Sequence, residues 1–401
     1  MPDRLLSPRD VIAWACGFVV VAAALVAIGF TSTDPDSALY AGLADRLAHE
    51  PVHRWLAPEW WGFWPDAQMI GFFREHPAGV LLLPAALSKA GIPPLQGSYV
   101  VGIAAGLASL ILMATLIRRF ATRDEARAAL VLLQLMPVAF IFRIRANHEY
   151  PMLVCLLVAL HGLVWASRGR RPWIGVLLVS FGLVAGLFVK GVFVLKILLA
   201  IGVWIALNPL RLAGARRRSL VAGLLGTGLM IAGAAAYDAA YLSATGERFW
   251  ALYWQRQMSP LGDVSGGAFV LAMIRNLLFY LSRMLWHPAP WSVALLVAAW
   301  RMRGSSRARW LEISESSREG LRFALTFAAL AILLLVPASR FAERYAFSAT
   351  HAVACISVVA ACRVWPRLAA RLAAADRHIP AAPALVWLAL ALLRLAVGSV
   401  R

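Results

Sequence analysis

Charged residues are scarce in this sequence, and acidic residues are rarer than basic ones. Only 15% of the 401 residues are charged, with 20 Asp and Glu against 39 Lys and Arg. So little charge, with 61% hydrophobic residues and a mean hydropathy of +0.72, excludes an ordinary soluble chain. Apolar stretches about long enough to cross a bilayer recur along the whole length. The sequence therefore predicts an all-α polytopic membrane protein.

Cysteine is also scarce. The four cysteines lie in or beside apolar runs and show no metal-ligand spacing, which predicts packing roles and no need for disulfides: Cys16, Cys155, Cys355 and Cys362. The sequence has no Gly-rich phosphate loop and no nucleotide-binding domain, which argues against an ATP-driven pump.

The net charge of +19 could indicate a nucleic-acid partner, but the placement of the basic residues favours another explanation. They cluster in short, alternate loops without interleaved aromatic residues, as cytoplasmic loops do under the positive-inside rule. These groups are Arg118, Arg119 and Arg123; Arg168, Arg170 and Arg171; Arg211, Arg216, Arg217 and Arg218; Arg301, Arg303, Arg307 and Arg309; Arg363, Arg367 and Arg371. Membrane topology therefore accounts for the charge.

With the basic loops inside, the chain 1–401 is expected to form one integral membrane domain of about eleven spans. The predicted spans are 11–30, 98–117, 126–142, 150–166, 173–189, 192–207, 220–236, 291–300, 321–337, 345–362 and 383–397. Residues 31–97 form a first outer loop. Residues 239–286 form a second outer segment, whose part 269–286 is interrupted by Arg275 and Arg283 and is expected at the interface.

The acidic residues are biased toward the outer side of this topology. Twelve of the 20 fall there: Asp34, Asp36, Asp45, Glu50, Glu59, Asp66, Glu75, Glu149, Asp238, Glu247, Asp263 and Glu343. Insertion does not explain this bias, because acidic residues do little to set topology.

The first outer loop also carries four tryptophans, Trp55, Trp60, Trp61 and Trp64. These residues favour a helix in the headgroup layer, either as an anchor alone or as one wall of a groove for a lipid substrate. The apolar stretch 76–84 is shorter than a span and is expected along the surface.

Five short elements follow one another on the outer side. The first loop opens with Asp36-Ser37-Ala38-Leu39-Tyr40 and ends near Arg74-Glu75-His76-Pro77-Ala78-Gly79. The others are Arg143-Ile144-Arg145-Ala146-Asn147-His148-Glu149-Tyr150-Pro151, then Lys190-Gly191, then Arg344-Tyr345. In this order and on this side, they resemble motifs of the GT-C glycosyltransferases that use polyprenyl-phosphate sugars, such as protein O-mannosyltransferases and lipid A aminoarabinose transferases. Ser37 stands where that family has a second acid, His76 where it has lysine, and Glu149 where it has aspartate.

The resemblance implies a GT-C fold with interfacial helices in the first outer loop. It also implies inverting transfer of a sugar from a polyprenyl-phosphate donor to a hydroxyl acceptor. Such transfer needs a base for the hydroxyl and positive charge for the departing phosphate. Asp36 is the expected base, with Asp34 as the second choice and Glu149 as a further catalytic acid.

Groups for the phosphate and the substrate are expected beside these acids. The expected phosphate-binding residues are Lys190, Arg344, Tyr345, Arg143, Arg145 and Arg340, and the expected substrate-binding residues are Tyr40, His76 and His148. Structural roles stay open for several of them. Asp34 and Asp36 could cap a helix that starts near Ala38, and the cations could snorkel toward lipid headgroups.

A divalent metal is a further hypothesis. Glu75, His76 and His287 carry ligand groups that suit zinc or a harder ion, although an isolated histidine is more often structural. No other cofactor is expected. The predicted location is a bacterial inner membrane with the site facing the periplasm, and the acceptor is open among glycan, lipid and protein. A transporter or flippase of a lipid-linked glycan is the alternative function.

Overall fold

The structure is a computed structural model of the chain. It describes residues 7, 9, 35–60, 71–136, 146–258, 267–303, 314–337 and 342–378, with the backbone alone at 35, 256–258, 301–303 and 375–378. The predicted spans 11–30 and 383–397 lie outside the described residues, as do Asp34, Arg143, Arg145 and Arg340.

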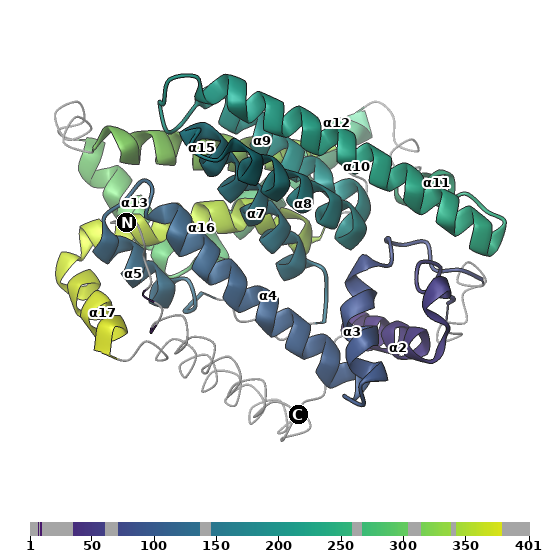
Figure 1. Cartoon of the computed structure of the whole chain (residues 1–401). Helices are drawn as coiled ribbons and strands as arrows, with labels where there is room; N and C mark the ends of the chain where they lie inside the picture. Colours follow the sequence, from purple (N-terminus) through teal and green to yellow (C-terminus); the bar gives the residue numbers. More distant parts are fainter. Residues whose placement is uncertain are drawn as a thin grey trace, which may run out of the picture.

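The described residues are helical, apart from turns and a single isolated bridge between Glu59 and Phe72 (Figure 1). The helices are α2 Pro35–His49, η1 Val52–Arg54, α3 Gly79–Lys89, α4 Pro94–Ile117, α5 Arg123–Leu132, α7 Glu149–Arg168, α8 Pro172–Lys190, η3 Gly191–Val194, α9 Leu195–Leu207, α10 Ala215–Thr245, α11 Phe249–Met258, α12 Gly267–Trp286, α13 Trp291–Arg303, α15 Glu315–Leu333, η5 Glu343–Ala346, α16 Phe347–Val364 and α17 Pro366–His378. The all-α prediction is confirmed.

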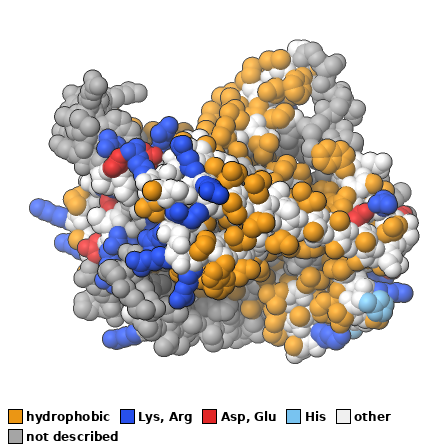
Figure 2. All heavy atoms as spheres, turned by 45° about the horizontal axis from the view of Figure 1, so that its top comes forward, with side chains coloured by type: hydrophobic (Ala, Val, Ile, Leu, Met, Phe, Trp, Pro, Cys, Tyr) orange, Lys and Arg blue, Asp and Glu red, His pale blue; other side chains and the backbone are white. Residues whose placement is uncertain are grey.

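Six helical segments of the described chain are long and apolar enough to cross a membrane. They are Pro94–Ile117, Glu149–Arg168, Pro172–Leu207, Ala215–Thr245, Gly267–Trp286 and Glu343–Val364. Hydrophobic side chains form a broad band across one face of the molecule, and Lys and Arg gather at one end of it (Figure 2). Such a band is expected of side chains that face lipid. Helices suit that environment because they satisfy their own backbone hydrogen bonds.

The segment Pro172–Leu207 contains two antiparallel arms, as the predicted spans 173–189 and 192–207 require. The chain reverses at Gly191, whose φ of +56° and ψ of −123° suit glycine. Trp204, near the end of α9, donates a hydrogen bond to Ser167 at the end of α7 (3.2 Å). Lys190, at the end of α8, instead pairs with Glu149 at the start of α7. The end of α8 therefore lies beside the start of α7, and the end of α9 lies beside the end of α7.

Helices α7 and α8 pack closely because glycines lie between them. A Cβ atom on Gly175 would come within 2.6 Å of Ala166 N, and one on Gly182 within 2.6 Å of Cys155 O. Small residues allow this approach of two backbones, which is the common way for helices to associate inside a membrane. The packing fixes the start of α7 beside the end of α8.

Two predicted elements differ in the structure. Helix α5 ends at Leu132 after ten residues, so it is too short at about 1.5 Å per residue to cross a bilayer by itself, while 137–142 of the predicted span 126–142 lie outside the described residues. Helix α12 is long and apolar enough to cross, and its predicted place at the interface stays a prediction. Trp60, expected among headgroups, is buried in a small core with Tyr40 and Phe73.

The ends of the molecule are separated by the bundle. Helices α2, α3 and α11 lie toward one end, and α5, α13 and α17 toward the other (Figure 1). The second end carries the basic loops after α4, α7 and α16 that predict the cytoplasmic side. We call it the inner end, and the end with α2 and α3 the outer end.

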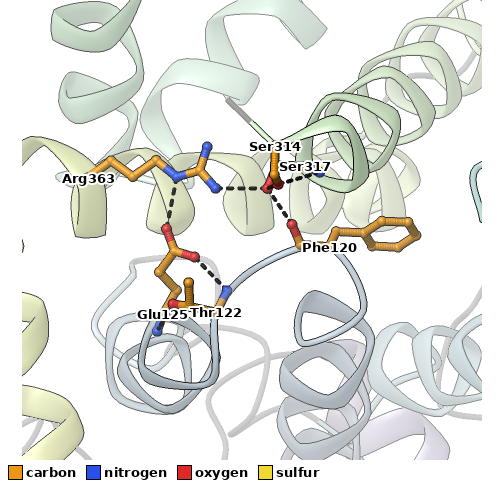
Figure 3. A network of polar contacts seen from close by, with 6 residues as sticks. All are labelled: Phe120, Thr122, Glu125, Ser314, Ser317 and Arg363. Carbon is orange, nitrogen blue, oxygen red and sulfur yellow. Dashed lines mark hydrogen bonds and ion pairs between the residues drawn. The ribbon is translucent and has the colours of Figure 1, made fainter. Parts of the chain in front are cut away.

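A polar network joins three helices at the inner end (Figure 3). Arg363 donates to Glu125 Oε1 (2.8 Å) and to Ser317 Oγ (3.0 Å), and Ser317 Oγ donates to Phe120 O. Thr122 and Glu125 form a capping box at the start of α5. Burial alone would raise the pKa of Glu125, but hydrogen bonds from Arg363 and Thr122 hold it below its usual value. The network therefore ties the inner ends of α5, α15 and α16 together.

Candidate active site

Four residues from distant parts of the chain meet at the outer end. Asp36 lies in the first turn of α2, Glu149 begins α7, Lys190 ends α8, and Arg344 lies in η5. All four were predicted as site residues from the sequence. The structure brings them together as two ion pairs, Asp36 with Arg344 and Glu149 with Lys190.

The Asp36–Arg344 pair is accessible to water. The side chains of Asp36 and Arg344 are 36% and 33% exposed. Helix α2 begins at Pro35, three residues before the predicted start, so Asp36 lies within the helix. The next residue, Ser37, is fully buried, and its Oγ accepts a hydrogen bond from Ala146 N (2.9 Å). This bond fixes the start of α2 beside the segment that leads into α7.

The Glu149–Lys190 pair is buried, with the two side chains 2% and 5% exposed. A buried charge is tolerated only when it is paired, and removal of one partner leaves the other uncompensated. Lys190 Nζ also lies 4.8 Å from the centre of the Phe193 ring. Glu149 bonds Lys190 through Oε1, while its Oε2 has no hydrogen-bond partner in the described part of the chain.

A tyrosine supports the turn after Lys190. Val192 N donates a hydrogen bond to Tyr253 Oη (3.0 Å), and a Cβ atom on Gly191 would come within 2.5 Å of that oxygen. Burial raises the pKa of Tyr253 to about 12, so the hydroxyl keeps its proton. Tyr253 was not predicted as a site residue.

Three cations and Glu149 line one pocket at this end. The pocket is small, with a volume of about 20 Å³, and Lys190, Lys196 and Arg344 contribute the positive charge. Lys196 donates a hydrogen bond to Tyr345 O, and the Tyr345 ring lies 5.1 Å from that of Phe193 at an angle of 43° between the ring planes. The sequence analysis missed Lys196. A lysine inside the apolar run 192–207 was an available signal, because such residues are costly in membrane helices.

The three predicted substrate-binding residues are in contact with one another. The His148 ring lies 4.6 Å from that of Tyr40 and 4.4 Å from that of His76. Burial, and then the nearby Lys190 charge, lower the pKa of His76 to about 3. Burial, His76 and Lys190 hold the pKa of His148 well below its usual value. Both imidazoles are therefore neutral at physiological pH.

The residues of the metal hypothesis are not gathered into a site. Among the described residues there is no group of three His, Cys, Asp or Glu that could hold a metal ion. His287 lies instead 3.3 Å from Glu343, while His76 packs on His148. Glu75, His76 and His287 are therefore not gathered around one point in the described part of the chain, and the metal stays a hypothesis.

The stretch His49-Glu50-Pro51-Val52-His53 has the spacing of a zinc-protease motif, which the sequence analysis did not use. That motif requires both histidines on one face of a helix. Helix α2 ends at His49, and Pro51 precedes the separate η1 turn. The spacing therefore does not produce a metal site.

Comparison with known proteins supports the fold. No protein-family model and no curated protein sequence matches the chain. Among solved structures, the chain is similar to ArnT from Cupriavidus metallidurans in the apo state, with a TM-score of 0.63 and 15% identity. The match covers 89% of this chain and 62% of that one. ArnT bound to undecaprenyl phosphate matches with a TM-score of 0.62 and 15% identity over 90% of this chain and 62% of that one.

These neighbours define the class of fold first. At 15% identity the comparison bears on the fold alone: the chain shares the fold of ArnT, as the predicted resemblance implies. The chain spans about three-fifths of the length of the ArnT chains that it matches.

Proposed function

We propose that the chain is a membrane glycosyltransferase. It takes a sugar from a polyprenyl-phosphate donor and transfers it, with inversion, to a hydroxyl acceptor at the outer face of a bacterial inner membrane. The observation that carries this proposal is the meeting of Lys190, Lys196 and Arg344 in one pocket at the end where Asp36 is exposed. This arrangement supplies positive charge for a phosphate and a carboxylate for a hydroxyl proton.

Donor binding frees the base, because Asp36 pairs with an arginine that also binds the donor phosphate. A guanidinium group binds phosphate oxygens through two parallel hydrogen bonds, so a donor phosphate competes with Asp36 for Arg344. Both side chains are about one third exposed, which leaves them room to separate. Asp36 then carries a free carboxylate only when the donor is in place.

The reaction follows as a single displacement. Asp36 accepts the proton of the acceptor hydroxyl, and the acceptor oxygen forms a bond to the anomeric carbon of the sugar. The bond between that carbon and the phosphate oxygen breaks, and its electrons remain on the phosphate. Lys190 and Arg344 stabilise the negative charge of the departing polyprenyl phosphate. Attack opposite the leaving group inverts the anomeric carbon.

A second pocket offers space for the lipid part of a donor. It has a volume of about 210 Å³ between α4, α7, α13, α15 and α16, and its walls are mainly leucine, phenylalanine and alanine. It shares Leu153, Leu156 and Ser348 with the charged pocket. The isoprenoid chain of a donor whose phosphate lies beside Lys190 would therefore enter apolar surroundings, which it requires.

The test is sugar transfer by the purified protein in lipid bilayers. The donor is undecaprenyl phosphate carrying a radiolabelled sugar, and a bacterial envelope extract supplies acceptors. We expect label to leave the donor and free undecaprenyl phosphate to accumulate together. Label that crosses the bilayer while it remains on the carrier would contradict the proposal and support a flippase.

A further inference from the structure

Three buried polar atoms in the candidate site have no hydrogen-bond partner in the described part of the chain. They are His76 Nδ1, His148 Nε2 and Glu149 Oε2. His148 and Glu149 are 2% and 3% exposed, so bulk water does not satisfy them. A buried polar atom without a partner is costly, and native proteins usually pair it with protein, ordered water or ligand. Three such atoms in one cluster indicate a place for a polar ligand.

The cluster lies beside the cations that face the pocket. His148 and Glu149 are consecutive, and Glu149 pairs with Lys190. The His76 ring contacts that of His148 at 4.4 Å. In a polyprenyl-phosphate sugar, the sugar is bonded directly to the phosphate. A donor whose phosphate is held by Lys190 therefore places its sugar beside Glu149, which lines the same pocket and is followed back along the chain by His148 and its neighbour His76.

A hydroxyl group matches these atoms well. It both donates and accepts, so it can pair with an imidazole nitrogen in either tautomer and can donate to the carboxylate oxygen. A sugar presents several hydroxyl groups on adjacent carbons, which suits a cluster of separate acceptors and donors. The edge of Tyr40 against His148 holds the imidazole in place.

An ammonium group matches poorly. It would approach Lys190, Lys196 and Arg344, and like charges repel strongly in a site with limited water. Of the described acids of the site, Glu149 pairs with Lys190, and Glu343 with Arg283 and His287. Asp36, once the donor phosphate frees it from Arg344, takes the proton of the acceptor hydroxyl in the proposed reaction. Glu75 is likewise not without a partner.

We propose that the site takes a neutral sugar, recognised through its hydroxyl groups by His76, His148 and the second oxygen of Glu149, and rejects a sugar that carries an ammonium group. This inference rests on the proposed function and names the class of donor sugar. It also separates this chain from its structural neighbour, which is an aminoarabinose transferase.

The test compares ligands that share one lipid. Purified full-length protein in nanodiscs is titrated with undecaprenyl phosphate, with its mannose ester, with its 4-amino-4-deoxyarabinose ester and with the N-formyl form of that last ester. The N-formyl group removes the charge while it keeps the ring. We expect the mannose and N-formyl ligands to bind about ten- to a hundredfold more tightly than the ammonium ligand at pH 7. The measurement is binding, so it needs no acceptor.

A variant connects the preference to the imidazole. His148→Phe keeps a ring against Tyr40 and removes both nitrogens. It should abolish the gain in affinity of the mannose ester over undecaprenyl phosphate, while the affinity for undecaprenyl phosphate itself stays unchanged. His148→Gln, which keeps a donor and an acceptor, should retain part of the gain. His49→Phe, on the exposed end of α2, is the matched control and should change neither affinity.

The outcomes separate the two proposals. Equal binding of the ammonium ligand and its N-formyl form would overturn the neutral-sugar inference and leave the proposed function intact. Unchanged mannose preference in His148→Phe would assign the three atoms to ordered water and would also overturn it. Failure of undecaprenyl phosphate and all three esters to bind would overturn the proposed function itself.

Discussion

The buried Glu149–Lys190 pair allows a stabilising role and a binding role to be measured separately. Glu149→Gln keeps the shape of the side chain but leaves Lys190, whose side chain is 5% exposed, without a countercharge. Removal of one partner of a buried pair typically costs about 3–5 kcal/mol of the free energy of unfolding. Lys190→Met leaves Glu149 without a countercharge in the same way. Each single variant should therefore unfold well below the wild-type temperature.

The double variant Glu149→Gln/Lys190→Met removes both charges together. Replacement of a whole buried pair by neutral groups of similar volume is often close to neutral for stability. The double variant should therefore regain most of the stability lost in the singles, with a coupling free energy of about 2 kcal/mol or more. Thermal unfolding in lipid nanodiscs measures this cycle. Losses that simply add would show that the two side chains do not depend on each other.

Donor binding should not recover in the double variant. Lys190 faces the pocket together with Lys196 and Arg344, and loss of a charged hydrogen bond costs about 1.5–3 kcal/mol. We therefore expect undecaprenyl phosphate to bind the double variant about ten- to a hundredfold more weakly, although the protein is stable. Wild-type affinity in a stable double variant would refute the assignment of Lys190 to the phosphate and leave it a structural cation.

Three further predictions concern other residues. Arg344→Ala should weaken binding of undecaprenyl phosphate about ten- to a hundredfold, measured by titration in nanodiscs; unchanged affinity would return Arg344 to snorkelling. Because the folded-state pKa of Glu125 is lowered, its stabilisation is present above the ordinary value of 4.5 and is lost as pH falls through the folded pKa. Arg363→Gln should therefore lower the unfolding temperature near pH 7 and reduce its decrease as the pH falls below about 4.5; an unchanged pH profile would refute the network of Figure 3 as its cause. A reporter fused after Arg218 should lie inside and one near Glu59 outside, and the reverse would place the site on the cytoplasmic face.

The sequence was sufficient to predict what depends on local pattern. The long apolar runs predicted α4, α7, α8, α9 and α16 within a few residues, and the middle of the longer α10, because length and hydropathy dictate a membrane helix. The predicted spans 173–189 and 192–207 also placed the reversal between them, where Gly191 adopts a backbone conformation that suits glycine.

Contacts between distant residues could not be predicted. The pairing of Asp36 with Arg344 joins residues at opposite ends of the described chain, and nothing in either local sequence indicates the other. Trp60 was assigned to headgroups because tryptophan is common there, but Phe73 and Tyr40 bury it in a small core. Tyr253 reaches the turn at Gly191 only in the folded chain, where its hydroxyl accepts a hydrogen bond from Val192 N.

The most direct test of the account is the effect of Asp36→Asn on sugar transfer. Asparagine keeps the size of the side chain and is accepted at the start of a helix about as well as aspartate, but it cannot take a proton from the acceptor. The variant should fold and bind undecaprenyl phosphate, since Arg344 is released from its ion pair. Its turnover should fall by about 10²–10⁴. Asp34→Asn, as the control, should be milder. Near-normal turnover in Asp36→Asn, or a larger loss in Asp34→Asn, would contradict Asp36 as the base.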